Sequence, residues 1–216
     1  MPASTQIHEQ LAAMSTAFAP LAAAWHVAIL AVVAAILAGW RPSKMVFATL
    51  LLAPLTLSVG SLAIAFGNDF NGVSFALLTL ALFVIGSRFS DDVAVVRGPV
   101  WSSVLGVALI LFGVGYPHFV DGPWYAALAT APVGVVPCPT LAVLAGATLV
   151  GGGLGSRALP VVLALWCGCY AAFGILRLGV TVDVGLLVAL VGLIAIELRR
   201  DDPSHRALME RGVPSR

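Results

Sequence analysis

The residues most able to do chemistry gather around one short segment, residues 134–140, which reads GVVPCPT. Pro137 and Pro139 fix two φ angles and predict an extended conformation for Cys138 at the head of an apolar run. Pro139 suits the first turn of a helix, so the thiol is expected near a helix N-terminus, where a thiolate is stabilised. With His118 nearby, a thiolate could bind a soft metal such as Cu(I). The alternative is a rigid helix start with a small buried side chain.

A second group of polar residues is expected near the same face of the protein as Cys138. Asp183 is predicted about one and a half turns inside the last apolar run, and Arg177 precedes it across a short link. An ionisable side chain inside a membrane is costly and suggests a functional site. An ion pair between the two is plausible, and it could serve structure alone. The candidate ligand or thiol residues are therefore Cys138, His118, Asp183, Arg177 and Thr140.

Signatures of known enzymes are missing from the sequence. It has no G-x-S-x-G, no H-E-x-x-H, no P-loop and no dinucleotide fingerprint. Its three cysteines, Cys138, Cys167 and Cys169, lack the spacing of a zinc module or a disulfide framework. The only lysine, Lys44, is predicted in a loop, which excludes a retinal Schiff base in the last span. We expect no catalytic residues and no cofactor, and favour a non-enzyme.

Composition decides which elements must position these residues. Of the 216 residues, 60% are hydrophobic and only 10% are charged, and the mean hydropathy is +1.04. A soluble domain carries about 25% charged residues, so the chain is expected to lie in a bilayer. The net charge of +1 gives no indication of a nucleic-acid partner.

The apolar residues form seven runs, each compared with the roughly 20 residues that a spanning helix needs. The runs cover 21–40, 45–66, 72–86, 100–116, 138–154, 158–176 and 178–198. They predict an all-α domain of seven transmembrane helices over 21–198, after an outer segment 1–20. A long outer loop covers 117–137, in which 124–136 is too short to span and is expected to be re-entrant or interfacial. Residues 199–216 form a basic tail.

The basic residues set the orientation. If every run crosses the membrane, ten of the eleven Lys and Arg residues fall on one side, and Arg177 is the exception. Such a bias marks the cytoplasmic side. The prediction is an N-terminus outside and a cytoplasmic C-terminus.

Small residues indicate where helices meet closely. Gly151 and Gly155 form a G-x-x-x-G pair near the inner end of the fifth run, and Gly106 and Gly113 can share one face of the fourth. In lipid, close backbone approach at such residues supplies packing that the hydrophobic effect cannot supply.

The chain resembles an uncharacterised family of bacterial multi-pass membrane proteins, domain of unknown function 6064. The likeness is carried by Gly115-Tyr116-Pro117 and by Gly134-x-x-Pro137-Cys138-Pro139-Thr140, and continues through Trp166, Gly168, Gly179-Val180 and Asp183, with Trp25 in the first run. It covers the C-terminal half well and the N-terminal half loosely. Around the exit of the second run the chain departs from the family, with Ala65, Phe66 and Gly67. The resemblance implies a bacterial inner-membrane protein and no established activity.

Three functions follow as hypotheses. The first is an integral membrane protein that binds or passes a small ligand near the outer face, around Cys138. The second is a redox or metal-handling protein that uses the Cys138 thiolate. The third is a structural subunit that associates with a membrane protein partner. A transporter would require a water-filled cavity reaching mid-membrane between the fifth, sixth and seventh runs.

Overall fold

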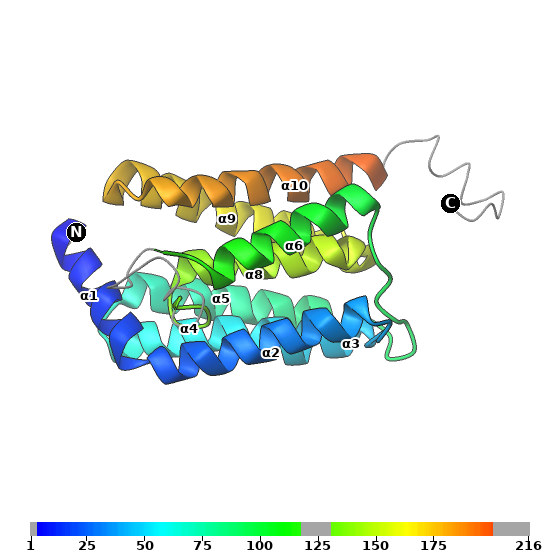
Figure 1. Cartoon of the computed structure of the whole chain (residues 1–216), viewed down its shortest axis with the longest axis horizontal. Helices are drawn as coiled ribbons and strands as arrows, with labels where there is room; N and C mark the ends of the chain where they lie inside the picture. The colour runs from blue at the N-terminus through cyan, green and yellow to red at the C-terminus, as the bar shows by residue number, and fades with distance from the viewer. Residues whose placement is uncertain (1–3, 118–130, 201–216) are drawn as a thin grey trace.

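The computed structural model describes residues 4–117 and 131–200, and this part of the chain is helical (Figure 1). The helices are α1 (Ser4–Ala17), α2 (Ala19–Leu37), α3 (Lys44–Val46), α4 (Ala53–Ala65), α5 (Asp69–Gly86), α6 (Val100–Val114), α8 (Pro137–Val150), α9 (Ala158–Leu178) and α10 (Val184–Arg200). Three short segments with other helical geometries lie between these α-helices. The π-helix η1 (Phe47–Leu52) joins α3 to α4, and the 3-10 helices η3 (Gly152–Gly155) and η4 (Thr181–Asp183) follow α8 and α9. Each of the seven apolar runs corresponds to one α-helix, except that the second run covers the consecutive segments α3, η1 and α4.

Within residues 4–117 and 131–200, five helical segments are long and apolar enough to cross a membrane. They are Ala19–Leu37, Lys44–Ala65, Asp69–Gly86, Ala158–Leu178 and Thr181–Arg199. The helices Val100–Val114 and Pro137–Val150 are apolar but shorter. The chain is therefore all-α with membrane-type helices, and α6 and α8 fall below the usual spanning length.

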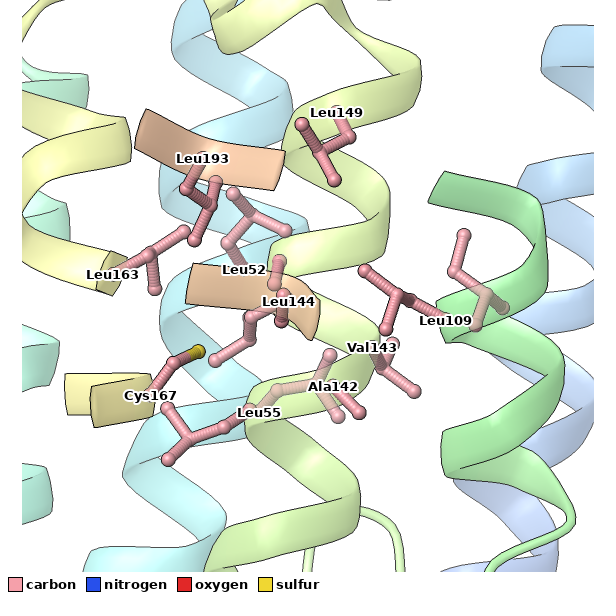
Figure 2. Close-up of a cluster of buried hydrophobic side chains, with 14 of the residues drawn as sticks. Leu52, Leu55, Leu109, Ala142, Val143, Leu144, Leu149, Leu163, Cys167 and Leu193 are labelled. Atoms are coloured by element: carbon pink, nitrogen blue, oxygen red, sulfur yellow. The ribbon is translucent and has the colours of Figure 1, made fainter. Parts of the chain in front are cut away.

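Helix α8 lies inside the bundle and contacts α6, α9, α10 and, less extensively, α4 (Figure 1). Only Cys138 and Ala147 of its 14 residues are partly exposed, and the others are buried. Figure 2 shows side chains of neighbouring helices packed around it, including Leu52, Leu163 and Leu193. A helix apolar on every side is expected only where protein or lipid surrounds it completely.

Glycines let α6 and α8 approach each other closely. A Cβ atom added to Gly106 would lie 2.5 Å from the carbonyl oxygen of Gly146, and one added to Gly146 would lie 2.5 Å from that of Gly106. One on Gly113 would lie 2.6 Å from the carbonyl oxygen of Pro139. The packing role predicted for Gly106 and Gly113 is confirmed, and Gly146 is the partner that the sequence pattern did not identify.

Gly151 and Gly155, the other predicted glycine pair, do not lie together on a helix face. Gly151 caps the end of α8, and Gly155 ends η3 with a φ of +72°. The fifth run therefore stops being helical at Val150, before the predicted end at 154. Because their φ angles or positions lie outside the α-helix, Gly151 and Gly155 build a tight turn and do not form a helix face.

The boundaries around the last two helices also differ from the prediction. Helix α9 continues to Leu178, and α10 begins only at Val184. Asp183 therefore lies in the 3-10 turn before α10, and its predicted position inside the last helix is wrong. The apolar link residues Val180 and Val182 caused the error, because they continue the apolar composition of the two helices on either side.

The N-terminal segment 1–20 contains a helix that the sequence analysis did not predict. Helix α1 lies obliquely across one end of the bundle (Figure 1). Its Leu11 and Met14 are buried in a small cluster with Val135 and Val136. Residues 131–136 are buried and form a non-helical turn that leads into α8. The rest of the segment 124–136 lies outside the described residues.

Candidate functional site

The carboxyl group of Asp183 is the centre of a buried polar cluster. The Tyr116 hydroxyl donates a hydrogen bond of 2.6 Å to its Oδ1, and the Cys138 thiol donates one of 3.4 Å to its Oδ2. Asp183 and Tyr116 are 1% and 0% exposed, so water does not compete for these bonds. We call Tyr116, Cys138 and Asp183 the Asp183 cluster.

Four helical elements position the Asp183 cluster. Tyr116 follows the end of α6 and packs edge-on against Phe112, with ring centroids 5.6 Å apart. Cys138 lies in the first turn of α8, and Asp183 ends η4. Gly174 of α9 completes the enclosure, because a Cβ atom there would overlap the Asp183 carboxylate. The cluster therefore links α6, α8, α9 and the start of α10.

In the Asp183 cluster, each oxygen of the buried carboxyl group accepts a hydrogen bond from a neighbouring side chain. Cys138 acts as a hydrogen-bond donor, so the thiol keeps its proton in this arrangement. Among the described residues, no group of three or more His, Cys, Asp and Glu side chains is placed to hold a metal ion. His118, the predicted second metal ligand, lies outside the described residues.

Arg177 is not part of the Asp183 cluster. It lies in the last turn of α9, and its side chain is exposed. Within residues 4–117 and 131–200, the hydrogen-bond partners of the Asp183 side chain are Tyr116 and Cys138, and no ion pair joins it to Arg177. The structure does not bring together the two residues that the sequence placed side by side, because α9 remains helical through Leu178.

The other residues of the 134–140 segment form a structural turn. Thr140 Oγ1 accepts a 2.8 Å hydrogen bond from the Gly134 N–H and donates one of 2.7 Å to the Val136 carbonyl. Gly134 has a φ of +75°, and the Trp25 ring fills the space where a Cβ would lie. Ser58 donates to the Gly134 carbonyl at 2.6 Å.

Pro137 and Pro139 lie in the first turn of α8, where their missing N–H groups leave no helical hydrogen bond unmade. This position was predicted for Pro139. The extended conformation predicted for Cys138 is wrong, because α8 already begins at Pro137 and Cys138 is helical. The proline-rich segment therefore fixes a turn and a helix start, and it places the Cys138 thiol against Asp183.

Trp166 lies in a separate pocket between α5 and α9. Its indole N–H donates a 3.1 Å hydrogen bond to Ser74, and the Tyr170 hydroxyl donates one of 2.9 Å to Asn71. The pocket has a volume of about 200 Å³. Its walls are mostly aromatic: Phe70, Ser74, Leu165, Trp166, Cys169, Tyr170 and Phe173. We call it the α5–α9 pocket.

Sequence reasoning had only weak signals for the residues that complete these sites. Tyr116 carried one through its place in Gly115-Tyr116-Pro117, but its pairing with Asp183 joins residues 67 positions apart. Ser74 and Tyr170 are single polar or aromatic residues within apolar runs, a pattern that is more often packing than a site. Their convergence depends on how α5 and α9 pack.

The cavity that a transporter would require is filled. Between α8, α9 and α10 the side chains of Leu144, Leu163, Cys167, Leu186 and Leu193 are 0% exposed and pack against one another (Figure 2). The α5–α9 pocket does not enter this space, and the Asp183 cluster does not line that pocket.

No protein-family model, no curated protein and no solved structure matches the chain significantly.

Proposed function

We propose that the protein is a multi-pass membrane protein with seven spans that binds a small, uncharged aromatic ligand near its outer face. The observation that carries the proposal is the α5–α9 pocket. Phe70 stacks on Phe173 with ring centroids 5.8 Å apart, and these rings, with Trp166 and Tyr170, offer faces to a planar molecule. The hydroxyl oxygens of Ser74 and Tyr170 retain lone pairs for a donor on the ligand.

The main objection to seven spans is the short length of α6 and α8, and the position of α8 inside the bundle answers it for that helix. A 14-residue helix is about 21 Å long, less than the roughly 30 Å of a hydrocarbon core. Helix α8 does not face lipid, because other helices surround it. The turn before it, residues 131–136, is buried, and Gly153 and Leu154 are buried in the turn after it. Non-helical backbone is tolerated at membrane depth when protein covers it.

The orientation is supported by the basic residues that gather at one end of the bundle. Arg97 bonds to the Ile36 carbonyl at the end of α2, and Arg199 lies 5.0 Å from the Trp101 ring. The Asp183 cluster and the α5–α9 pocket lie toward the other end. With the basic end cytoplasmic, in a bacterial inner membrane, both would lie in the outer half.

The ligand proposal can be tested with p-cresol, whose ring and hydroxyl match the pocket. In saturation-transfer NMR of the full chain in detergent, p-cresol should bind saturably. Cys169→Phe, which fills the pocket, should abolish binding, and Ser74→Ala should weaken it by about fivefold, the loss of one hydrogen bond worth about 1 kcal/mol.

The matched control is Leu176→Phe, which adds a ring to the same helix at a position that is 84% exposed and outside the pocket. It should bind like the unaltered protein. Binding of p-cresol that is unaffected by Cys169→Phe would refute the pocket as the site.

A further inference from the structure

Helix α2 is held against the bundle mainly at its ends. Near its start, the Trp25 indole donates a 3.4 Å hydrogen bond to Ser58 of α4. At its end, the Arg97 guanidinium donates to the carbonyl oxygens of Ile36, at 2.9 Å, and Leu37. Only Ala22, His26, Ile29 and Ile36 are buried along the helix.

Between these two attachments a groove separates α2 from η1, α4, α6 and α8. By the measure that gives the α5–α9 pocket about 200 Å³, the groove holds about 60 Å³, so it is narrow. When the space on the open side is counted, the two volumes are about 520 Å³ and about 570 Å³. Its lining is apolar and includes Ala28 and Val33 of α2, Phe47 of η1, Ile110 of α6 and Ala147 of α8. We call it the α2 groove.

The α2 groove is suited to hydrocarbon and not to water. Water in a cavity needs two to four polar partners, and this lining provides none along its length. An empty groove would deprive its lining of dispersion contacts. Because the groove is open at the side of a helix that lies in the bilayer, an acyl chain can enter it laterally.

A π-helical turn shapes one wall of the α2 groove. In η1 the N–H of Ala53 bonds to the carbonyl of Ala48, five residues back. Pro54 follows directly and cannot donate, so the regular ladder could not continue through it. The widened turn carries Phe47, Leu51 and Leu52, and all three line the groove. Such turns are frequent at functional sites.

Basic residues lie at the end of the bundle where Ile36 and Phe47 line the α2 groove. Arg97 bonds to the Ile36 carbonyl, and Arg41 and Lys44 belong to the short stretch of chain that joins α2 to η1. The backbone of Lys44 bonds to Val93, which brings the loop after α2 beside the loop before α6. Arg41, Lys44 and Arg97 therefore lie on adjoining segments. The acidic residues of the second loop, Asp91 and Asp92, are exposed and precede Val93.

We propose that the α2 groove binds an anionic phospholipid of the inner leaflet. One acyl chain lies against Val33, Ile110 and Ala147, and the phosphate lies at the basic inner end, near Arg41 and Lys44. Basic sites between helices on the cytoplasmic side recognise anionic headgroups in this way. The inference depends on the helices lying in a membrane and is independent of the ligand in the α5–α9 pocket.

The test is native mass spectrometry of the full chain in detergent with added dioleoyl phosphatidylglycerol or dioleoyl phosphatidylcholine. The protein should retain one phosphatidylglycerol in preference to phosphatidylcholine. The double variant Arg41→Gln/Lys44→Gln should lower phosphatidylglycerol affinity by up to about 30-fold, since each cation near a membrane surface contributes about 1 kcal/mol. Arg97 is left intact because it anchors α2.

Two further variants separate groove binding from general lipid adhesion. Ala28→Phe places a ring in the groove and should reduce retention of both lipids. Val27→Phe adds the same ring to a neighbouring position that is 71% exposed and outside the groove, and it should have no effect. Arg88→Gln, which removes an inner-side cation outside the groove, should also leave the retention of both lipids unchanged. Equal retention of the two lipids, or retention unchanged by Ala28→Phe, would overturn the proposal.

Discussion

At the scale of single residues, Asp183 shows how this chain accommodates a buried carboxyl. Its side chain receives hydrogen bonds from Tyr116 and Cys138, and Gly174 leaves the space that it occupies. A buried polar group that loses its partner costs more than the net strength of the bond. Each member of the cluster should therefore affect stability through Asp183.

Tyr116→Phe should lower the free energy of unfolding by about 1–3 kcal/mol, because Asp183 loses its shorter hydrogen bond while the ring still packs on Phe112. Unfolding in mixed micelles, followed by circular dichroism, measures the change. Cys138 provides a matched pair: Cys138→Ser keeps a donor and should be milder than Cys138→Ala. Unchanged stability of Tyr116→Phe would mean that the bond contributes nothing.

At the scale of elements, the fold depends on the contact between α6 and α8. The two helices meet through glycines whose carbonyl oxygens lie where a partner's Cβ would be. Hydrophobic burial drives little association between helices inside lipid, so close packing has to supply the attraction. Gly106 and Gly146 should therefore tolerate no larger side chain.

Gly146→Ala should destabilise the protein by about 1–3 kcal/mol, the usual cost of overpacking a tight interface. Gly168→Ala is the control, because its added Cβ would meet nothing closer than 3.5 Å and alanine favours a helix. Thermal unfolding in detergent should show a lower midpoint for the first variant and an equal or higher one for the second. The reverse order would contradict the role assigned to the glycines.

At the scale of the whole molecule, the sequence pattern predicts seven helices that share one axis and carry their cations at one end. Membrane-impermeant maleimide can check the spans in intact cells, in a background of Cys138→Ser, Cys167→Ala and Cys169→Ala. Asp69→Cys should react from outside, and Asp91→Cys only after permeabilisation. Reaction of both from outside would show that α5 does not span, and the opposite pattern would reverse the orientation.

The helices themselves could be predicted because hydropathy alone marks them. What could not be predicted depends on packing. The turns at residues 151–155 and 179–183 contain buried apolar residues such as Leu154 and Val180, so hydropathy does not separate these turns from the helices that they join. Helix α1 has no long apolar run and is ordered by contacts of Leu11 and Met14 with a distant turn.

The candidate site was predicted in part. Cys138 and Asp183 do meet, but Tyr116 joins them through a contact across 67 positions, and Arg177 does not. Only the mutual placement of α6, α8 and η4 determines these contacts, and no local pattern contains it.

The buried position of α8 has a consequence for biogenesis. Its 14 residues leave the ribosome before α9 and α10, which later cover it. During that interval a helix too short to span comfortably is exposed to lipid on the side that they will occupy. Insertion of α8 should therefore be completed only when its successors arrive. A nascent chain stalled between α8 and α9 is the intermediate most exposed to quality-control proteases.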